Sequence, residues 1–164
     1  MDEPQSDPKI RKRRDGLTRF LRAEALTQGF DVCRITLPDS IMWLRNIRGG
    51  DVARNPVAHG FVLLHDDGRV ELFMAAAKLK DLGDHLDDGV SVAEPDAFLD
   101  RLAALEGPVR LDKGTAPQLL ADVLGDKAAY GEEPCALPKA RKNAAEIAGA
   151  AEAHLRDGAA MVEL

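Results

Sequence analysis

Apolar residues recur along the chain at two different periods, which predict helices and strands in alternation. Residues 10–28 carry apolar side chains at helical spacing, so a first helix is expected there. Residues 30–37 form a short apolar run rich in β-branched side chains, which is typical of a buried strand. Residues 60–65 and 70–74 are two more strand-like runs, and they flank Asp67-Gly68, a dipeptide that favours a tight hairpin turn. These two runs predict an antiparallel pair.

After the hairpin, short helical and extended segments alternate as far as residue 130. Asp96 is expected to cap one of the helices, and Thr115 with Gln118 to form the capping box of the next. Alternation together with one hairpin predicts an α/β domain, in which a single mixed sheet has helices on both faces. The predicted helices are 78–86, 97–105 and 116–125, and the predicted strands are 89–95, 108–112 and 127–130.

The last segment, from Pro138 to Leu164, is predicted to form one long alanine-rich helix. Its apolar residues fall on one stripe at helical spacing. Burial of such a stripe favours either docking back onto the domain or pairing with a second copy, and we expect a homo-oligomer that forms through residues 143–164. The stripe consists of Ile147, Ala151, Leu155 and Val162.

Composition excludes several classes of partner. The 164 residues are 45% hydrophobic and 30% charged, as in an ordinary globular domain, and residues 1–7 are expected to be a disordered leader. The net charge of -6 opposes nucleic-acid binding, which depends on cationic side chains. No apolar run approaches the roughly 20 residues of a membrane span. Cys33 and Cys135 have neither zinc-ligand nor disulfide-framework spacing, so we expect a cytoplasmic protein. From the charge and the short apolar runs we expect neither a nucleic-acid nor a membrane partner.

Candidate catalytic residues are few, and none has a complete motif. Ser40 lacks a nucleophile-elbow sequence and is expected to cap a helix together with Asp39. Residues 84–89 are acidic but lack the spacing of a calcium loop, so a solvated helix end is predicted. The histidines show no metal-ligand spacing and are expected at the surface or at helix ends. We therefore expect no catalytic, cofactor-binding or metal-binding residue in this chain. The histidines are His59, His65, His85 and His154.

The stretch DSIMWLRNIRGGDV, residues 39–52, holds the most unusual local sequence. Trp43 is expected to anchor the helix that precedes the glycines. The turn formed by Arg48, Gly49, Gly50 and Asp51 could bind an anion through its backbone N–H groups, although a structural turn is the simpler interpretation.

Four segments in order resemble one known family. They are LPDSIMWLRNIRGGDVARNPV, GRVELFMAAAKL, VRLDKGTAP and LPKARKNAAEIAGAAEAHLRDGAAMV, and they are similar to Xaa-Pro aminopeptidase, also called aminopeptidase P. The resemblance is to the larger, three-domain form and extends from the first predicted helix to Leu164. It implies that the chain is the non-catalytic middle domain, of the creatinase/prolidase N-terminal type, whose fold is a ribonuclease-H-like mixed sheet with helices.

The resemblance also implies what lies elsewhere in the polypeptide. Residues 8–136 would be the creatinase N-terminal-like domain, and 137–164 the linker and first helix of a missing catalytic domain. That catalytic domain of the same polypeptide is the implied partner, and it would hold two divalent metal ions, Mn or Zn. In relatives of this fold the loop after the corresponding helix faces the catalytic cleft of the same subunit or of a neighbouring one.

By this resemblance, Arg48 would approach a substrate carboxylate or carbonyl, Asp51 would hold Arg48, and Trp43 would fix the helix beneath them.

Two functional hypotheses remain open on the sequence. The first is a non-catalytic domain of a metallopeptidase that removes an N-terminal residue preceding proline. It would contribute to domain assembly and could contribute to the substrate entrance, and alone it would hydrolyse nothing. The second is a stand-alone peptidase-like module that binds proteins or peptides without catalysis. The native reading frame distinguishes the two, since a frame that ends at Leu164 favours the second.

Overall fold

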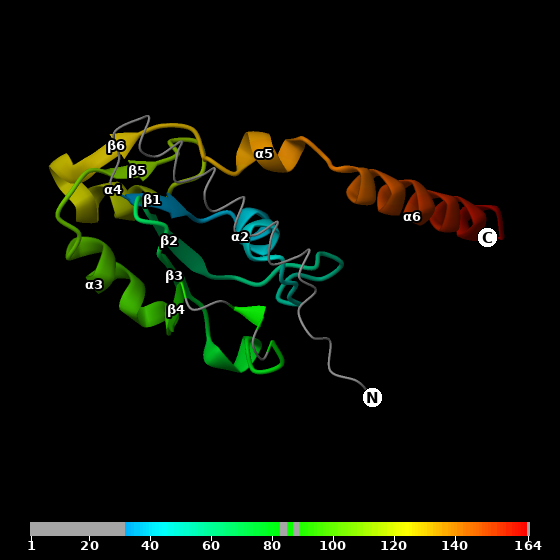
Figure 1. The fold of residues 1–164 in the computed structure, drawn as a ribbon, viewed down its shortest axis with the longest axis horizontal. Coiled ribbons are helices and arrows are strands. Elements are labelled where there is room, and N and C mark those ends of the chain that lie inside the picture. The colour runs from blue at the N-terminus through cyan, green and yellow to red at the C-terminus, as the bar shows by residue number, and fades with distance from the viewer. Residues whose placement is uncertain (1–31, 83–84, 87–88, 164) are drawn as a thin grey trace.

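The computed structural model describes residues 32–82, 85–86 and 89–163. Within these ranges, six strands form one mixed sheet in the order β4-β3-β2-β1-β5-β6 (Figure 1). The predicted leader, the predicted helix at 10–28 and the first residues of the predicted strand at 30–37 lie outside the described residues. The strands are β1 (Val32–Ile35), β2 (Phe61–His65), β3 (Val70–Phe73), β4 (Val90–Ala93), β5 (Val109–Leu111) and β6 (Ala128–Tyr130).

Strands β2 and β3 form the predicted hairpin. They pair antiparallel, with Phe61 opposite Phe73 and Leu64 opposite Val70. Gly68 adopts a φ of 92°, a left-handed conformation that glycine reaches without a steric penalty. The hairpin prediction is therefore confirmed, and the turn chemistry explains its register.

Strand β1 lies in the middle of the sheet. It pairs antiparallel with β2 and parallel with β5. All four of its residues are buried, in agreement with the continuous apolar run that predicted a buried strand. Since β3–β4 and β5–β6 are also parallel, the sheet is mixed, as predicted.

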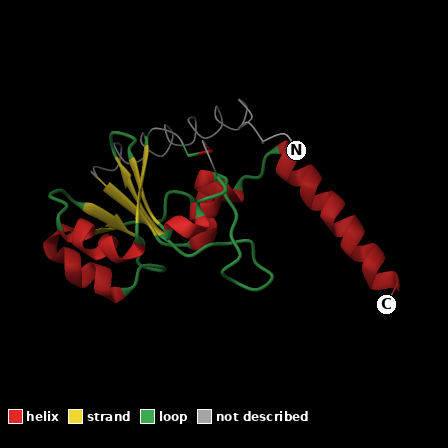
Figure 2. Ribbon diagram, turned by 90° about the horizontal axis from the view of Figure 1, so that it is seen from below, coloured by secondary structure: helices red, strands yellow, loops and turns green. Residues whose placement is uncertain are grey.

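Helices cover both faces of the sheet, also as predicted. Helix α2 (Pro38–Arg45) packs on one face, and α3 (Phe98–Ala103) and α4 (Gln118–Leu124) pack on the other (Figure 2). The alternation of side chains along β2 divides the apolar core, because Val62 and Leu64 join the α2 layer while Leu63 joins the α3/α4 layer. The two layers share one sheet and so belong to one domain.

Several predicted helix starts are wrong. Asp96 lies within a short 3-10 turn, η3 (Pro95–Ala97), and neither α3 nor α4 has a side-chain cap. Pro117 precedes α4, and Gln118 donates a hydrogen bond to Asp122 instead of closing a capping box with Thr115. Pro117 is the N-cap residue of α4, with a φ of -57° and an extended ψ of 141°, so α4 begins directly after this proline.

The predicted helix at 78–86 is also wrong in its described part. The structure has a 3-10 turn, η1 (Ala76–Lys78), followed by turns and by bends. A second 3-10 turn, η4 (Gly125–Lys127), follows α4 directly.

The C-terminal segment is two helices and not the single helix that was predicted. Helix α5 (Ala136–Ala140) ends at Arg141, and α6 (Ala144–Glu163) begins after Asn143. The Asn143 side chain accepts a hydrogen bond from the Glu146 backbone, and the Glu146 carboxylate accepts one from the Asn143 backbone. This reciprocal capping box fixes the start of α6, and the sequence NAAE could have predicted it.

Helix α6 extends away from the sheet (Figures 1 and 2). None of the helices in the described part of the chain combines the length and the apolar character that crossing a membrane requires.

Candidate functional site

The RGGD stretch begins a loop, residues 48–57, whose base is held by backbone hydrogen bonds. Asn46 ends α2 in the left-handed region with a φ of 51°. The Gly49 N–H then donates to the Pro56 carbonyl at 3.3 Å, and the Asp51 N–H to the Val57 carbonyl at 3.0 Å. Residues 50–56 are exposed, whereas residues 57 and 58 are buried. The 48–57 loop is thus a projecting segment with a fixed base.

Gly49 is needed at the base of this loop because of a close backbone approach. A Cβ atom at Gly49 would lie 2.4 Å from Ala58 Cβ and 2.7 Å from the Ala58 nitrogen. At Gly50, by contrast, a Cβ atom would meet nothing within 4 Å. The two neighbouring glycines therefore have different roles, and only the first is required by packing.

Asp51 ties the 48–57 loop to the turn that follows the hairpin. Its carboxylate accepts hydrogen bonds from the His59 backbone N–H at 2.7 Å and from Lys78 Nζ at 2.5 Å. The Lys78 hydrogen bond, followed by that of His59, lowers the pKa of Asp51. The expectation that Asp51 holds Arg48 is wrong, because Arg48 is exposed and donates to the adjacent Ile47 carbonyl. Lys78 is 27 residues away from Asp51, so no local sequence pattern could predict the contact between them.

Trp43 is half-buried and packs against the apolar layer beneath α2, so its expected role as a helix anchor agrees with the structure. His85 is also half-buried, and it was expected at the surface or at a helix end. Its ring donates to the Arg45 carbonyl at 3.0 Å, near the C-terminal end of α2.

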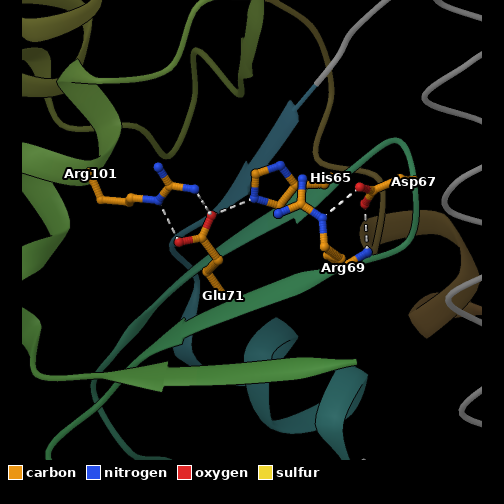
Figure 3. A network of polar contacts seen from close by, with 5 residues as sticks. All are labelled: His65, Asp67, Arg69, Glu71 and Arg101. Atoms are coloured by element: carbon orange, nitrogen blue, oxygen red, sulfur yellow. Dashed lines mark hydrogen bonds and ion pairs between the residues drawn. The ribbon is translucent and has the colours of Figure 1, made fainter. Parts of the chain in front are cut away.

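A polar network on the other face of the sheet joins strands β2 and β3 to helix α3 (Figure 3). His65 Nε2 lies 2.6 Å from Glu71 Oε1, and Arg101 donates to both Glu71 oxygens at 2.7 and 3.0 Å. His65 was expected at the surface or at a helix end, but it lies in β2 and is only 6% exposed. At the hairpin turn, Arg69 pairs with Asp67 at 2.5 Å. Through the Arg101–Glu71 pair, this network links α3 to the sheet.

Replacing Glu71 with glutamine is expected to remove part of the stability that the folded protein loses at acidic pH. Burial alone would raise the pKa of Glu71, but the hydrogen bonds from Arg101 and His65 outweigh it, and the pKa is lowered. The stability that ionised Glu71 contributes is therefore present above the unfolded pKa of about 4.3, and it is lost as the pH falls through the lower folded value. At neutral pH the variant should be less stable by about 1–2 kcal/mol.

Urea unfolding at neutral and acidic pH measures this effect. The free-energy difference between wild type and Glu71→Gln should shrink as the pH falls below about 4.3. Asp67→Asn is the matched control, since the Asp67 side chain is 46% exposed and its ion pair should contribute little. An equal acid dependence in wild type and Glu71→Gln would contradict the assignment.

Glu133 is a second buried carboxylate, and it lies where the segment after β6 meets α2. It is 5% exposed, and its Oε2 accepts a hydrogen bond from the Ser40 hydroxyl at 3.0 Å. Its Oε1 has no hydrogen-bond partner within the described ranges. Burial, as the main cause, raises the pKa of Glu133. The expectation that Ser40 and Asp39 cap α2 is wrong, because Ser40 binds Glu133 and Asp39 pairs with Lys139.

Replacing Glu133 with glutamine is expected to flatten the pH dependence of stability above about pH 4.3. A raised folded pKa means that the folded state holds this proton more tightly than the unfolded state. The stabilisation is thus complete below the unfolded pKa and is lost as the pH rises through the folded value. The isosteric amide has no such titration, and it can still accept the Ser40 hydrogen bond.

The measurement is the urea midpoint of wild type and Glu133→Gln from weakly acidic to neutral pH. Glu132→Gln is the control, because its exposed neighbouring side chain should leave the wild-type profile unchanged. The assignment fails if wild type shows no loss of stability over this range that Glu133→Gln lacks.

Three further buried groups were not identified from the sequence as candidate site residues. Arg34 is 3% exposed, its Nη2 donates to Thr36 at 2.5 Å, and burial lowers its pKa to about 10. Burial raises the pKa of Cys33 to about 12 and that of Cys135 well above its ordinary value. Both thiols are therefore protonated at neutral pH and poor nucleophiles. Across the described ranges, no three histidine, cysteine, aspartate or glutamate residues are placed to hold a metal ion.

The sheet order, the helices on both faces and the fixed loop after α2 define a class of domain. Residues 9–146 match the family model of the Creatinase/Prolidase N-terminal domain, and the chain belongs to this family. Among solved structures, the X-prolyl aminopeptidase of Caenorhabditis elegans, described as a cytosolic enzyme with a di-nuclear active site, superposes with a TM-score of 0.79 at 23% identity. The superposition covers 92% of this chain and 26% of that one.

Two fungal aminopeptidases are also similar to this chain in sequence. A probable Xaa-Pro aminopeptidase P of Laccaria bicolor is 32% identical over 150 residues, which are 87% of this chain and 23% of the relative. The corresponding protein of Aspergillus niger is 35% identical over 145 residues, 79% of this chain and 23% of the relative. The N-terminal domain of the cytoplasmic peptidase PepQ from Mycobacterium tuberculosis has the same fold, with a TM-score of 0.55 at 15% identity over 73% of this chain and 95% of that one. This chain spans about a quarter of the length of the Laccaria bicolor and Aspergillus niger aminopeptidases.

Proposed function

We propose that this chain is the non-catalytic domain of a metal-dependent Xaa-Pro aminopeptidase, an enzyme that removes an N-terminal residue preceding proline. The observation that carries the proposal is the match to Xaa-Pro aminopeptidase P of Laccaria bicolor, which takes in 87% of this chain but 23% of that enzyme. In this proposal residues 8–136 form the domain, 137–164 lead into a catalytic domain of the same polypeptide, and the enzyme is cytoplasmic.

The two divalent metal ions, Mn or Zn, would be bound by the catalytic domain and not by this chain. The described residues offer no group of metal ligands, and the buried thiols are protonated. The role of this chain would then be to assemble with the catalytic domain. Docking of α5 on α2 supports such a role, because Lys139 pairs with Asp39 and Ser40 with Glu133, so the segment that leads to α6 is held in place.

The 48–57 loop is proposed to line the substrate entrance, with Arg48, Gly49 and Asp51 in the loop and Trp43 supporting α2 beneath it. Three features support this. The base of the loop is fixed by hydrogen bonds, residues 50–56 are exposed, and the Arg48 guanidinium lies on the surface. With Asp51 neutralised by Lys78, Arg48 is the charge that this part of the loop offers to a substrate carboxylate or carbonyl.

Peptidase assays test the assignment. The purified chain with Mn²⁺ and an Xaa-Pro peptide should release no amino acid. The protein made from the longer reading frame should cleave the peptide, and a chelator should abolish the cleavage. Chelator-sensitive cleavage by this chain alone would contradict the proposal, as would an inactive longer protein.

Arg48→Ala in the longer protein tests the role of the loop separately. We expect a raised KM and an unchanged melting temperature, because Arg48 is exposed. Arg69→Ala is the matched control, since its side chain is 62% exposed and lies on the hairpin turn. Equal KM values for the two variants would exclude Arg48 from the entrance while leaving the assignment of the domain intact.

A further inference from the structure

Arg54 lies at the tip of the 48–57 loop in a backbone conformation that arginine rarely adopts. The Asn55 N–H donates to the Val52 carbonyl at 3.1 Å, and the same two residues form an antiparallel bridge, so the chain turns tightly between them. Arg54 is the third residue of this turn and the one with a positive φ, 63°. This is the pattern of a type II turn, whose third position favours glycine or asparagine.

The local structure gives no reason for an arginine at this position. A residue with a Cβ atom has a steric cost in the left-handed region that glycine avoids. The Arg54 side chain is exposed, and within the described ranges it has no hydrogen-bond or ion-pair partner that would offset this cost. Backbone strain of this kind is concentrated at ligand contacts, which indicates that the guanidinium binds a group from another molecule.

The charges around the tip leave this loop positive. Asp51 is its one acidic residue, and the Asp51 carboxylate is already held by Lys78 Nζ at 2.5 Å and by the His59 N–H at 2.7 Å. The guanidiniums of Arg48 and Arg54 are therefore not neutralised from within the loop. On a chain with a net charge of -6, a projecting segment with two such cations is suited to a carboxylate.

We propose that Arg54 is a specificity-determining residue that binds a carboxylate of the peptide substrate beyond its proline. This inference rests on the proposed function, in which the 48–57 loop lines the substrate entrance. An aminopeptidase cleaves at the N-terminal end of a peptide, so the part beyond the proline is the part that leads out through the entrance. Backbone hydrogen bonds fix the base of the loop, and the tip is thereby held where that part of the peptide passes.

Cleavage assays of the longer protein with three peptides test this role. Ala-Pro-Ala-Ala amide has no carboxylate, Ala-Pro-Glu-Ala amide has an acidic side chain, and Ala-Pro-Ala-Ala with a free C-terminus has a terminal one. For at least one of the two carboxylate peptides, the wild-type KM should be about 5-fold lower than for the neutral peptide, as expected of an exposed ion pair. Which of them shows the effect identifies the source of the carboxylate. Arg54→Asn should abolish the preference, and Arg54→Glu should reverse it.

The melting temperature separates binding from a structural role. Arg54→Asn should not lower it, because asparagine tolerates the left-handed conformation better than arginine does. Arg69→Asn is the matched control, since it makes the same substitution on the exposed hairpin turn, and it should keep the wild-type preference. A preference that Arg54→Asn retains, or that Arg69→Asn loses to the same extent, overturns the proposal.

Failure of this inference is distinguishable from failure of the proposed function. Chelator-sensitive cleavage with equal wild-type KM values for the three peptides overturns the role of Arg54 alone. A longer protein without such cleavage contradicts the proposed function, and calorimetric titration with the same three peptides then decides on Arg54. In that case, tighter binding of a carboxylate peptide that Arg54→Asn abolishes supports the inference, and its absence overturns it.

Discussion

Replacing Phe98 with alanine will lower the free energy of unfolding by about 3–5 kcal/mol. Phe98 is 2% exposed and lies at the centre of the layer between the sheet and α3. Its ring stacks on Phe61 with the centroids 4.3 Å apart, and it meets Phe73 edge to face at 5.2 Å. Alanine would remove both aromatic contacts and leave a cavity that the surrounding strands cannot fill, because β2 and β3 are held in register by their hydrogen bonds.

The measurement is urea unfolding followed by circular dichroism, with the melting temperature as a second reading. A loss of this size should lower the melting temperature of a chain of this length by about 10 °C. Leu99→Ala is the matched control, because Leu99 is the next residue of the same helix and is 38% exposed. Its cost should be well below that of Phe98→Ala. Equal costs for the two variants would mean that α3 does not pack as described.

Replacing Gly49 with alanine is expected to cost about 1–3 kcal/mol through overpacking. The added methyl group would approach the Ala58 Cα to 2.8 Å and the Ala58 nitrogen to 2.7 Å, and these are backbone atoms that cannot rotate away. The clash would force the two sides of the 48–57 loop apart and weaken the hydrogen bond from Gly49 to the Pro56 carbonyl. The variant thus changes both stability and the shape of the proposed entrance.

Gly50→Ala is the control, since a Cβ atom there has open space within 4 Å, and its stability should stay within about 0.5 kcal/mol of wild type. Hydrogen exchange of the Asp51 amide reports the loop directly, because this N–H donates to the Val57 carbonyl. Protection should be lost in Gly49→Ala and retained in Gly50→Ala. If the two variants behave alike, the close approach to Ala58 does not hold the loop.

The confirmed predictions rest on short stretches whose structure is decided by neighbours in sequence. The hairpin is the clearest case, because two β-rich runs flank Asp67-Gly68, and the φ of 92° at Gly68 is a conformation that glycine supplies locally. The apolar run at 30–37 likewise predicted a buried strand, and all four residues of β1 (Val32–Ile35) are buried. The alternation of helices and strands was sufficient to predict a mixed sheet with helices on both faces.

Helix ends were predicted less well, although their signals are also local. Prolines stand at the starts of η3 and α4 in place of the expected caps, Pro95 as the first residue of η3 and Pro117 as the N-cap residue of α4. The start of α6 was available in the sequence, since asparagine at 143 followed by glutamate at 146 is a capping box. The helical spacing of the apolar stripe instead predicted one longer helix without this boundary.

Composition, period and turn chemistry therefore determined the architecture of this protein, and the order of its motifs indicated its family. Only the tertiary structure decided which polar groups meet. Ser40 and Glu133 are 93 residues apart, and Asp51 and Lys78 are 27 apart, so no local pattern could pair them. The same holds for Glu71, which binds His65 of the neighbouring strand and also Arg101, a residue of a helix 30 residues later in the chain. The physical reason is that a charge or hydroxyl binds whichever partner the folded backbone brings within about 3 Å, and that distance is set by the packing of the sheet and its helices.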